Sequence, residues 1–429
     1  MMDPMASALS RAGFVVVAPD LPGHGGNATP LMEGALDSAV TDAVGLAKEL
    51  ADGGPVAVVG HSMGAGAVTD WAAQNPAAAT VAISLPDAAE LPQDPARPAN
   101  LLLLWGAAEQ QRFVDAALTG LRRGYPEGEP GQTYGDREMG NARRAGQIAG
   151  AEHISVIYRQ QTFEEVSAWL SSGSGRPSPR GDARLIGILL VLGGGVVAAR
   201  PLLARSAGVA PDADVRAQLE EVRRAGGGAA GRLLILTGAA VGAALGAAAI
   251  QGLTELVPVA VTGYLAGWFA LGALLLWVAS RRLGAGTGDV HGLGWGALAG
   301  AALSLAMALP ARLSWAAYEL LAVRWWVFLP LLMILGAWFW AEWRVIEGFR
   351  GWLRAVLLVA SRLVIVAVLL GSVSLLGAPS FLSLTVPLLV PILLLLAVLA
   401  GWAWDPLAAG ASQAVPTALV VATTFPIVG

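Results

Sequence analysis

The chain of 429 residues contains no cysteine. This absence excludes a disulfide framework, a thiolate nucleophile and a cysteine-ligated zinc site. Charge is also scarce, because only 14% of the residues are Asp, Glu, Lys or Arg, whereas 55% are hydrophobic. The formal net charge is −4, and no basic patch with interleaved aromatic residues occurs. Nucleic acid is therefore not an expected partner.

The hydrophobic residues are unevenly distributed along the chain. Residues 1–183 contain most of the acidic residues, whereas the remainder contains runs such as VPLLVPILLLLAVLAGWAW. The two parts are joined by a Ser/Gly/Pro/Arg segment, SSGSGRPSPRGDAR, which has no apolar periodicity and reads as a linker. We predict one domain over residues 1–170, a linker over 171–183 and a second domain over 184–429.

Apolar windows recur after the linker, and each approaches or exceeds the roughly 20 residues that a helix needs to cross a bilayer. Seven in succession predict an all-α, multi-pass transmembrane domain with the lipid bilayer as its partner. The windows lie near residues 184–203, 232–252, 256–279, 293–311, 325–343, 355–377 and 384–403.

The arginines predict the orientation of these spans, because short loops rich in Arg stay cytoplasmic. The loops after the first, third and fifth spans hold 11 arginines, against five on the opposite side, linker included. We therefore expect a cell-membrane protein whose N-terminal domain is extracytoplasmic. The single lysine, Lys48, and the abundant Ala and Gly suggest a GC-rich, bacterial genome.

Polar and aromatic residues in the spans raise two further expectations. Arg362 lies inside the sixth span, and an intramembrane charge is by default a functional hypothesis. We favour the alternative that its side chain snorkels to the cytoplasmic end, about two turns away. Tryptophans bracket the fifth span, as interfacial aromatic residues do. These are Trp325, Trp326, Trp338, Trp340 and Trp343.

The first 170 residues alternate short β-rich runs with helix-compatible stretches. This alternation predicts a mostly parallel sheet covered by helices on both faces, with reactive groups at the carboxyl ends of the strands. Strands are expected at 14–20, 56–60, 80–85, 100–106 and 145–153. Helices are expected near 36–52, 63–75, 110–123 and 162–171.

A G-x-S-x-G motif, Gly60-His61-Ser62-Met63-Gly64, falls between an expected strand and an expected helix. The glycines permit a sharp turn that exposes the Ser62 hydroxyl. The backbone N–H of Met63, at the mouth of the following helix, would then point at a developing oxyanion. The motif alone is weak in a chain with 54 glycines, and its context strengthens it.

A serine nucleophile needs a base and an orienting carboxylate. Of the four histidines, His153 follows the last expected strand and His291 lies in the membrane part. The His61 side chain is expected to point away from the serine and to serve in packing. Glu109 comes three residues after the glycine that ends a strand. Asp115 is a rival acid that we place second, because it lies well inside the following helix.

Residues 8–170 resemble the α/β-hydrolase family in the segments FVVVAPDLPGHG, VAVVGHSMG, LLLLWGAAE and GAEHIS. The resemblance implies Ser62 as nucleophile, His153 as general acid/base, Glu109 as orienting acid and the Met63 N–H as an oxyanion donor, in the family's chain order. It implies no cofactor and no metal, and it gives His24 a structural place in a turn. The membrane part resembles no family that we recognise.

Two departures from the family follow. The strands that normally precede the one at Phe14, and the loop with the second oxyanion donor, are missing, so we expect the sequence to be N-terminally incomplete. Only 47 residues separate Ser62 from Glu109, which leaves no room for a lid and predicts an open pocket.

Together these features predict a membrane-anchored serine hydrolase. It would cleave an ester, thioester or amide of an acyl-containing small molecule or lipid through an acyl-enzyme; acyl transfer would use the same residues. The alternative is a non-catalytic, hydrolase-like binding head of a membrane transporter or sensor. The missing strands favour the alternative, and the complete Ser/Glu/His set favours the enzyme.

Overall fold

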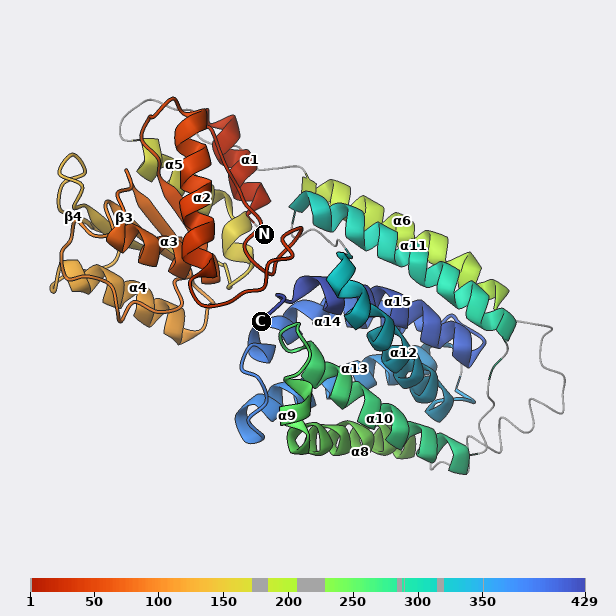
Figure 1. Ribbon diagram of the computed structural model, residues 1–429. Coiled ribbons are helices and arrows are strands. Elements are labelled where there is room, and N and C mark those ends of the chain that lie inside the picture. The colour runs from red at the N-terminus through yellow and green to blue at the C-terminus, as the bar shows by residue number, and fades with distance from the viewer. Residues whose placement is uncertain are drawn as a thin grey trace. The chain divides into compact units, whose positions relative to one another are not determined.

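The computed structural model describes residues 2–171, 184–206, 228–283, 288, 290–314, 320–349 and 351–428. The chain forms two compact units (Figure 1). Unit 1 comprises Met1–Pro22, Leu31–Leu185 and Leu313–Trp315; unit 2 comprises Gly23–Pro30, Ile186–Arg312 and Ala316–Gly429. Of the predicted linker, residues 172–183 lie outside the described residues.

Unit 1 is built on a five-stranded sheet with the order β1-β2-β3-β5-β4. The first four strands in this order are parallel, and the short β4 is antiparallel to β5. The strands are β1 (Val58–His61), β2 (Thr80–Ile83), β3 (Leu101–Gly106), β4 (Thr133–Tyr134) and β5 (Arg143–Ile148). The parallel strands end near one another, so the loops that follow them share one edge of the sheet.

Helices cover both faces of this sheet (Figure 1). The helices of unit 1 are α1 (Asp3–Arg11), α2 (Ala35–Leu50), α3 (Met63–Gln74), α4 (Gln111–Gly124), the 3-10 turn η1 (Ser155–Tyr158) and α5 (Gln160–Ser171). Alternate residues of β3 face opposite ways: Leu102 and Leu104 pack with α1 and α5, and Leu101 and Leu103 pack with α3 and α4. The predicted mostly parallel α/β architecture is confirmed.

The expected strand at 14–20 is wrong. These residues form neither a helix nor a strand ladder, and Val15 is 67% exposed. A β-rich run becomes a strand only when a neighbouring strand accepts its hydrogen bonds, and within the described residues β1 pairs only with β2. The last strand also ends five residues early, at Ile148, and the chain then turns towards His153.

Unit 2 is helical, and six of its helices are long and apolar enough to cross a membrane when the described residues are considered. The six spans are Gly228–Ala249 (α8), Thr262–Arg282 (α10), Val290–Ala308 in α11 (Val290–Ser314), Ala322–Val345 (α12), Gly351–Leu375 (α13) and Pro406–Thr424 (α15). The remaining helices are α6 (Arg184–Arg205), α9 (Gln251–Thr254) and α14 (Leu382–Ala400). The helices indicate a membrane protein, as predicted.

The number and positions of the spans differ in part from the seven expected. Helix α15 was not predicted, because Ser412, Gln413 and Pro416 interrupt its apolar sequence. These residues are tolerated because 72% of its apolar window is buried inside the protein, so little of it has to face lipid. Helices α6 and α14 coincide with predicted windows but are not among the six, and α14 contributes an apolar stretch at Leu389–Ala400.

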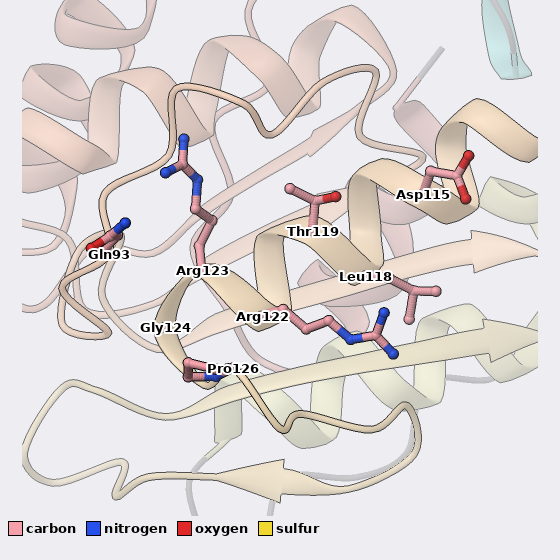
Figure 2. A pocket seen from close by; sticks show the side chains of 8 residues that line it. All are labelled: Gln93, Asp115, Leu118, Thr119, Arg122, Arg123, Gly124 and Pro126. Atoms are coloured by element: carbon pink, nitrogen blue, oxygen red, sulfur yellow. The ribbon is translucent and has the colours of Figure 1, made fainter.

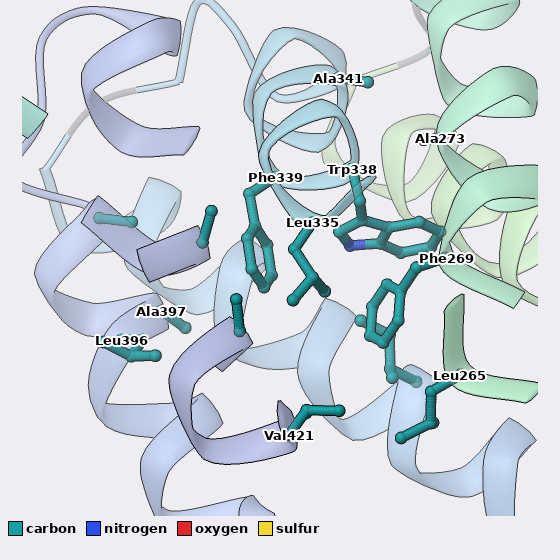
Figure 3. Close-up of a cluster of buried hydrophobic side chains, with 14 of the residues drawn as sticks. Leu265, Phe269, Ala273, Leu335, Trp338, Phe339, Ala341, Leu396, Ala397 and Val421 are labelled. Carbon is teal, nitrogen blue, oxygen red and sulfur yellow. The ribbon is translucent and has the colours of Figure 1, made fainter. Parts of the chain in front are cut away.

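Large aromatic side chains form part of the core of unit 2 between α10 and α12 (Figure 3). The Trp338 ring lies 5.0 Å from that of Trp268 and meets Phe269 edge-on at 5.4 Å. Trp338 and Trp343 are buried, whereas Trp326 is 83% exposed. The interfacial interpretation is therefore wrong for Trp338 and Trp343, whose rings fill space between helices.

The snorkelling expected for Arg362 is also wrong. Its side chain is fully buried, and its guanidinium pairs with both carboxylate oxygens of Glu342 and donates to Gln413 Oε1 at 2.7 Å. Side chains lean towards the N-terminus of their own helix, so the Arg362 side chain leans towards the start of α13. There it meets Glu342, which lies near the end of the preceding helix α12. The Arg362 side chain thus extends towards the end of the span that we expected to be cytoplasmic, but its guanidinium pairs with Glu342 inside the protein.

Candidate active site

The G-x-S-x-G motif forms the expected sharp turn between β1 and α3. Ser62 sits between the strand and the helix at φ 53° and ψ −121°, a strained conformation for a residue with a side chain. Its backbone N–H is fixed by the carbonyl oxygen of Ile83 on β2 at 2.9 Å. A Cβ on Gly60 would lie within 2.6 Å of the Ala65 nitrogen, so glycine is required there for the helix to start so close to the strand.

The start of α3 supplies donors beside the serine hydroxyl. Met63 is the first residue of the helix, and within the described part of the chain its N–H donates to no protein group. The first N–H groups of a helix have no intrahelical acceptor and carry partial positive charge. The Met63 N–H is therefore available to a negatively charged oxygen near Ser62, and its role as an oxyanion donor stays a prediction.

The structure brings Ser62, His153 and Glu109 together from three loops that follow β1, β5 and β3. The His153 Nε2 atom lies 2.9 Å from Ser62 Oγ, and its Nδ1 atom lies 2.6 Å from Glu109 Oε1. Both distances are those of hydrogen bonds. The three side chains form one continuous chain from carboxylate to imidazole to hydroxyl.

Glu109 is held rigidly for this contact. Its side chain is fully buried, and its second oxygen, Oε2, accepts the backbone N–H of Gly106 at 2.7 Å. The loop after β3 is tied to the histidine loop, since the Ala108 N–H donates to the Ala151 carbonyl at 2.8 Å. A Cβ on Gly106 would lie 2.5 Å from that same Ala151 oxygen, so the close approach of the two loops depends on glycine.

His61 lies against the site, and its contacts go beyond the packing expected from the sequence. Its Nε2 atom is 2.7 Å from the backbone oxygen of His153, and the two rings lie 4.9 Å apart. Burial, reinforced by the neighbouring His153, lowers the pKa of His61 to about 3. At neutral pH the ring is therefore uncharged and carries its proton on Nε2, where it can donate to the carbonyl.

Phe113 is a site residue that sequence reasoning missed. Its ring stacks on His153 at 4.3 Å with an interplanar angle of 25°. It lies in the first turn of α4, four residues after Glu109, and is buried. The only signal in the sequence was its position four residues after Glu109. An aromatic residue at the start of a helix is ordinarily interpreted as part of the hydrophobic core.

The other acid and the other histidines lie away from this arrangement. Asp115 accepts from the Gln111 side chain at 2.9 Å and lines an open groove of about 710 Å³ along α4 (Figure 2). None of Ser62, Glu109 and His153 lines that groove, so its size does not identify a substrate site. His24 and His291 belong to unit 2, where the Trp295 indole lies 2.9 Å from His291 Nε2. Among the described residues, no group of three or more His, Asp or Glu side chains could hold a metal ion.

The α/β-hydrolase class is defined by a mostly parallel sheet with helices on both faces and by three residues at the ends of its strands. A strained serine follows one strand, and an acid and a histidine follow two others, as in this protein. Residues 1–118 match the family model described as serine aminopeptidase, S33, which belongs to that superfamily. The N-terminal part of the chain thus has the α/β-hydrolase fold and resembles that superfamily in sequence, as predicted. The match includes Ser62 and Glu109 and ends before His153. No curated protein and no solved structure matches the chain.

Proposed function

We propose that the protein is a membrane-anchored serine hydrolase that cleaves an ester, thioester or amide through an acyl-enzyme. The observation that carries the proposal is the hydrogen-bonded chain from Glu109 through His153 to the Ser62 hydroxyl. Fold likeness alone does not establish activity, since the α/β-hydrolase fold also serves other functions. The three groups, by contrast, have the contacts that nucleophilic catalysis requires.

In the first half-reaction, His153 Nε2 accepts the Ser62 hydroxyl proton while Oγ attacks the substrate carbonyl carbon. The carbonyl oxygen gains the negative charge, and the Met63 N–H stabilises it. When the tetrahedral intermediate collapses, the bond to the leaving group breaks and His153 returns the proton to that group. The acyl chain remains bonded to Ser62.

In the second half-reaction, water replaces the leaving group. His153 accepts a proton from the water as its oxygen attacks the acyl carbon, and then returns that proton to Ser62 Oγ as the acid departs. Glu109 accepts from Nδ1 throughout, so it holds the imidazole with Nε2 free to face the serine and stabilises the imidazolium. An acceptor other than water would turn the same steps into acyl transfer.

The membrane part supports an acyl-containing small molecule or a lipid as the substrate, because the hydrolase is anchored where such molecules concentrate. The arginine distribution in the sequence favours an extracytoplasmic position for the hydrolase domain. The alternative function is a binding head of a transporter or sensor with no catalytic role. It has no use for a strained serine that is hydrogen-bonded to a histidine and a buried carboxylate.

Covalent labelling of the full-length protein in detergent tests the proposal. A fluorophosphonate probe should bond to Ser62, and Ser62→Ala should abolish the labelling. His153→Ala should slow labelling about 10³-fold or more, because the hydroxyl loses its base. Asp115→Asn is the matched control and should label at the unaltered rate. Absence of labelling in the unaltered protein would refute the catalytic proposal and favour the binding head.

A further inference from the structure

His153 lies in a loop, so no helix or strand hydrogen bonds fix the position of its backbone. Residues 149–154 between β5 and η1 form no regular secondary structure. A general base must nevertheless hold its Nε2 atom at the serine and its Nδ1 atom at the acid, since a displacement of about 1 Å can cost about 10²-fold in rate. Contacts with the backbone and the ring of His153 therefore bear on catalysis.

Two residues make such contacts. His61 lies 2.7 Å from the backbone oxygen of His153, and Phe113 stacks on its ring at 4.3 Å. The His61 ring also meets the His153 ring, at 4.9 Å and 40°. Phe113 and His61 therefore each contact His153 directly.

We propose that His61 and Phe113 are positioning residues that hold His153 in place, His61 by donating its Nε2–H to the His153 carbonyl and Phe113 by stacking on the imidazole. The proposal rests on the function proposed above and extends it to two residues that act through His153. His61 is the last residue of β1, so the strand that presents the nucleophile also fixes the loop that carries its base. Phe113 lies in the helix that follows Glu109, so the acid and the stacking ring are fixed together.

The neutrality of His61 suits this role. A second positive charge beside His153 would oppose formation of the imidazolium during the reaction. Burial keeps the His61 pKa near 3, so the ring stays neutral while His153 accepts and returns its proton. His61 can thus donate a hydrogen bond without competing for the catalytic proton.

Paired variants of the full-length protein separate positioning from bulk packing. His61→Leu removes the donor, whereas His61→Gln keeps an N–H group; Phe113→Leu removes the ring, whereas Phe113→Trp keeps a stacking surface. With p-nitrophenyl butyrate as substrate, His61→Leu and Phe113→Leu should lower kcat about 10- to 100-fold with little change in KM. The conservative partner of each pair should recover most of the loss, and His291→Gln, which lies in unit 2, should leave kcat unchanged.

A readout that does not depend on activity accompanies the kinetics. The chain has four histidines, so protein labelled with ¹⁵N-histidine gives few ring signals. The Nδ1 proton of His153, shared with Glu109, should give a downfield signal that His61→Leu broadens and His61→Gln retains. If the unaltered protein neither labels nor turns over substrate, the proposed function fails, while this signal still decides the positioning role. An unchanged signal and unchanged kcat in both leucine variants overturn the inference, as does a glutamine variant as impaired as His61→Leu.

Discussion

The two glycines of the G-x-S-x-G motif should respond oppositely to alanine. A Cβ added to Gly60 would overlap the Gly64 carbonyl and lie 2.6 Å from the Ala65 nitrogen, and all these atoms are backbone. No side chain can rotate away, so the start of α3 must move off β1. Overpacking of a fixed neighbourhood costs about 1–3 kcal/mol and occasionally more, and this position belongs at the upper end of that range.

Gly64 is the matched control. A Cβ there would meet no atom within 4 Å, and the residue lies inside the first turn of α3. Alanine is favoured over glycine in a helix by about 1 kcal/mol, so Gly64→Ala should be neutral or slightly stabilising. The two substitutions add the same atom two residues either side of Ser62, so only the local geometry distinguishes them.

The assay is the temperature at which full-length protein in detergent loses its capacity to be labelled at Ser62 by a fluorophosphonate. A loss of about 3 kcal/mol in a unit of this size lowers the midpoint by about 10 °C. We expect that shift, and slower labelling at room temperature, for Gly60→Ala only. Equal shifts in the two variants, or an unshifted Gly60→Ala, would show that the tight contact between β1 and α3 does not govern the turn.

Four further outcomes are expected. Glu109→Gln should lower kcat about 10²- to 10⁴-fold in steady-state ester hydrolysis with little effect on stability, since the imidazolium loses its anionic partner; an unaltered kcat would exclude Glu109 as the orienting acid. Because the folded-state pKa of His61 is about 3, below its unfolded value near 6.5, the unfolded state binds a proton first as pH falls. The stability that comes from keeping His61 neutral is therefore fully present above pH 6.5, and the free energy of unfolding falls by about 1.4 kcal/mol per pH unit between pH 6.5 and pH 3. Chemical denaturation measured across that range should show this slope in the unaltered protein and not in His61→Gln. Arg362→Met alone should destabilise the membrane part by about 3–5 kcal/mol, because it leaves a buried charge without its partner, whereas adding Glu342→Leu should restore most of the loss of thermal stability. A reporter that fluoresces only in the cytoplasm, fused after Ser174, should stay dark if the hydrolase domain is extracytoplasmic.

The catalytic candidates could be predicted because their signals are local. The motif around Ser62 needs only a strand before it and a helix after it, and both are visible as apolar periodicity. Glu109 and His153 follow strand ends, and in a parallel sheet those ends meet at one edge. The contacts of His61 and Phe113 could not be predicted, because they depend on the path of the loop after β5, which has no periodicity.

In the membrane part, too, local features could be predicted from the sequence, whereas contacts between helices could not. Hydropathy identified long spans that face lipid, but it missed α15, whose polar and small residues are buried against other helices. It likewise assigned Arg362 to the membrane surface, because a single helix offers a buried arginine no partner. Glu342 becomes that partner only when the tertiary structure brings α12 and α13 close enough for these two long side chains to meet.

The sequence by itself therefore determined the two-part organisation, the alternation of strands and helices, and the residue types and order of the candidate triad. These features follow from composition, hydrophobic periodicity and motif spacing, which are properties of consecutive residues in the chain. Only the tertiary structure decided that residues 14–20 form no strand, that Gly60 but not Gly64 is sterically required, and that Arg362 is paired rather than exposed. These outcomes depend on which distant segments come within a few ångströms of one another, and no local pattern specifies such distances.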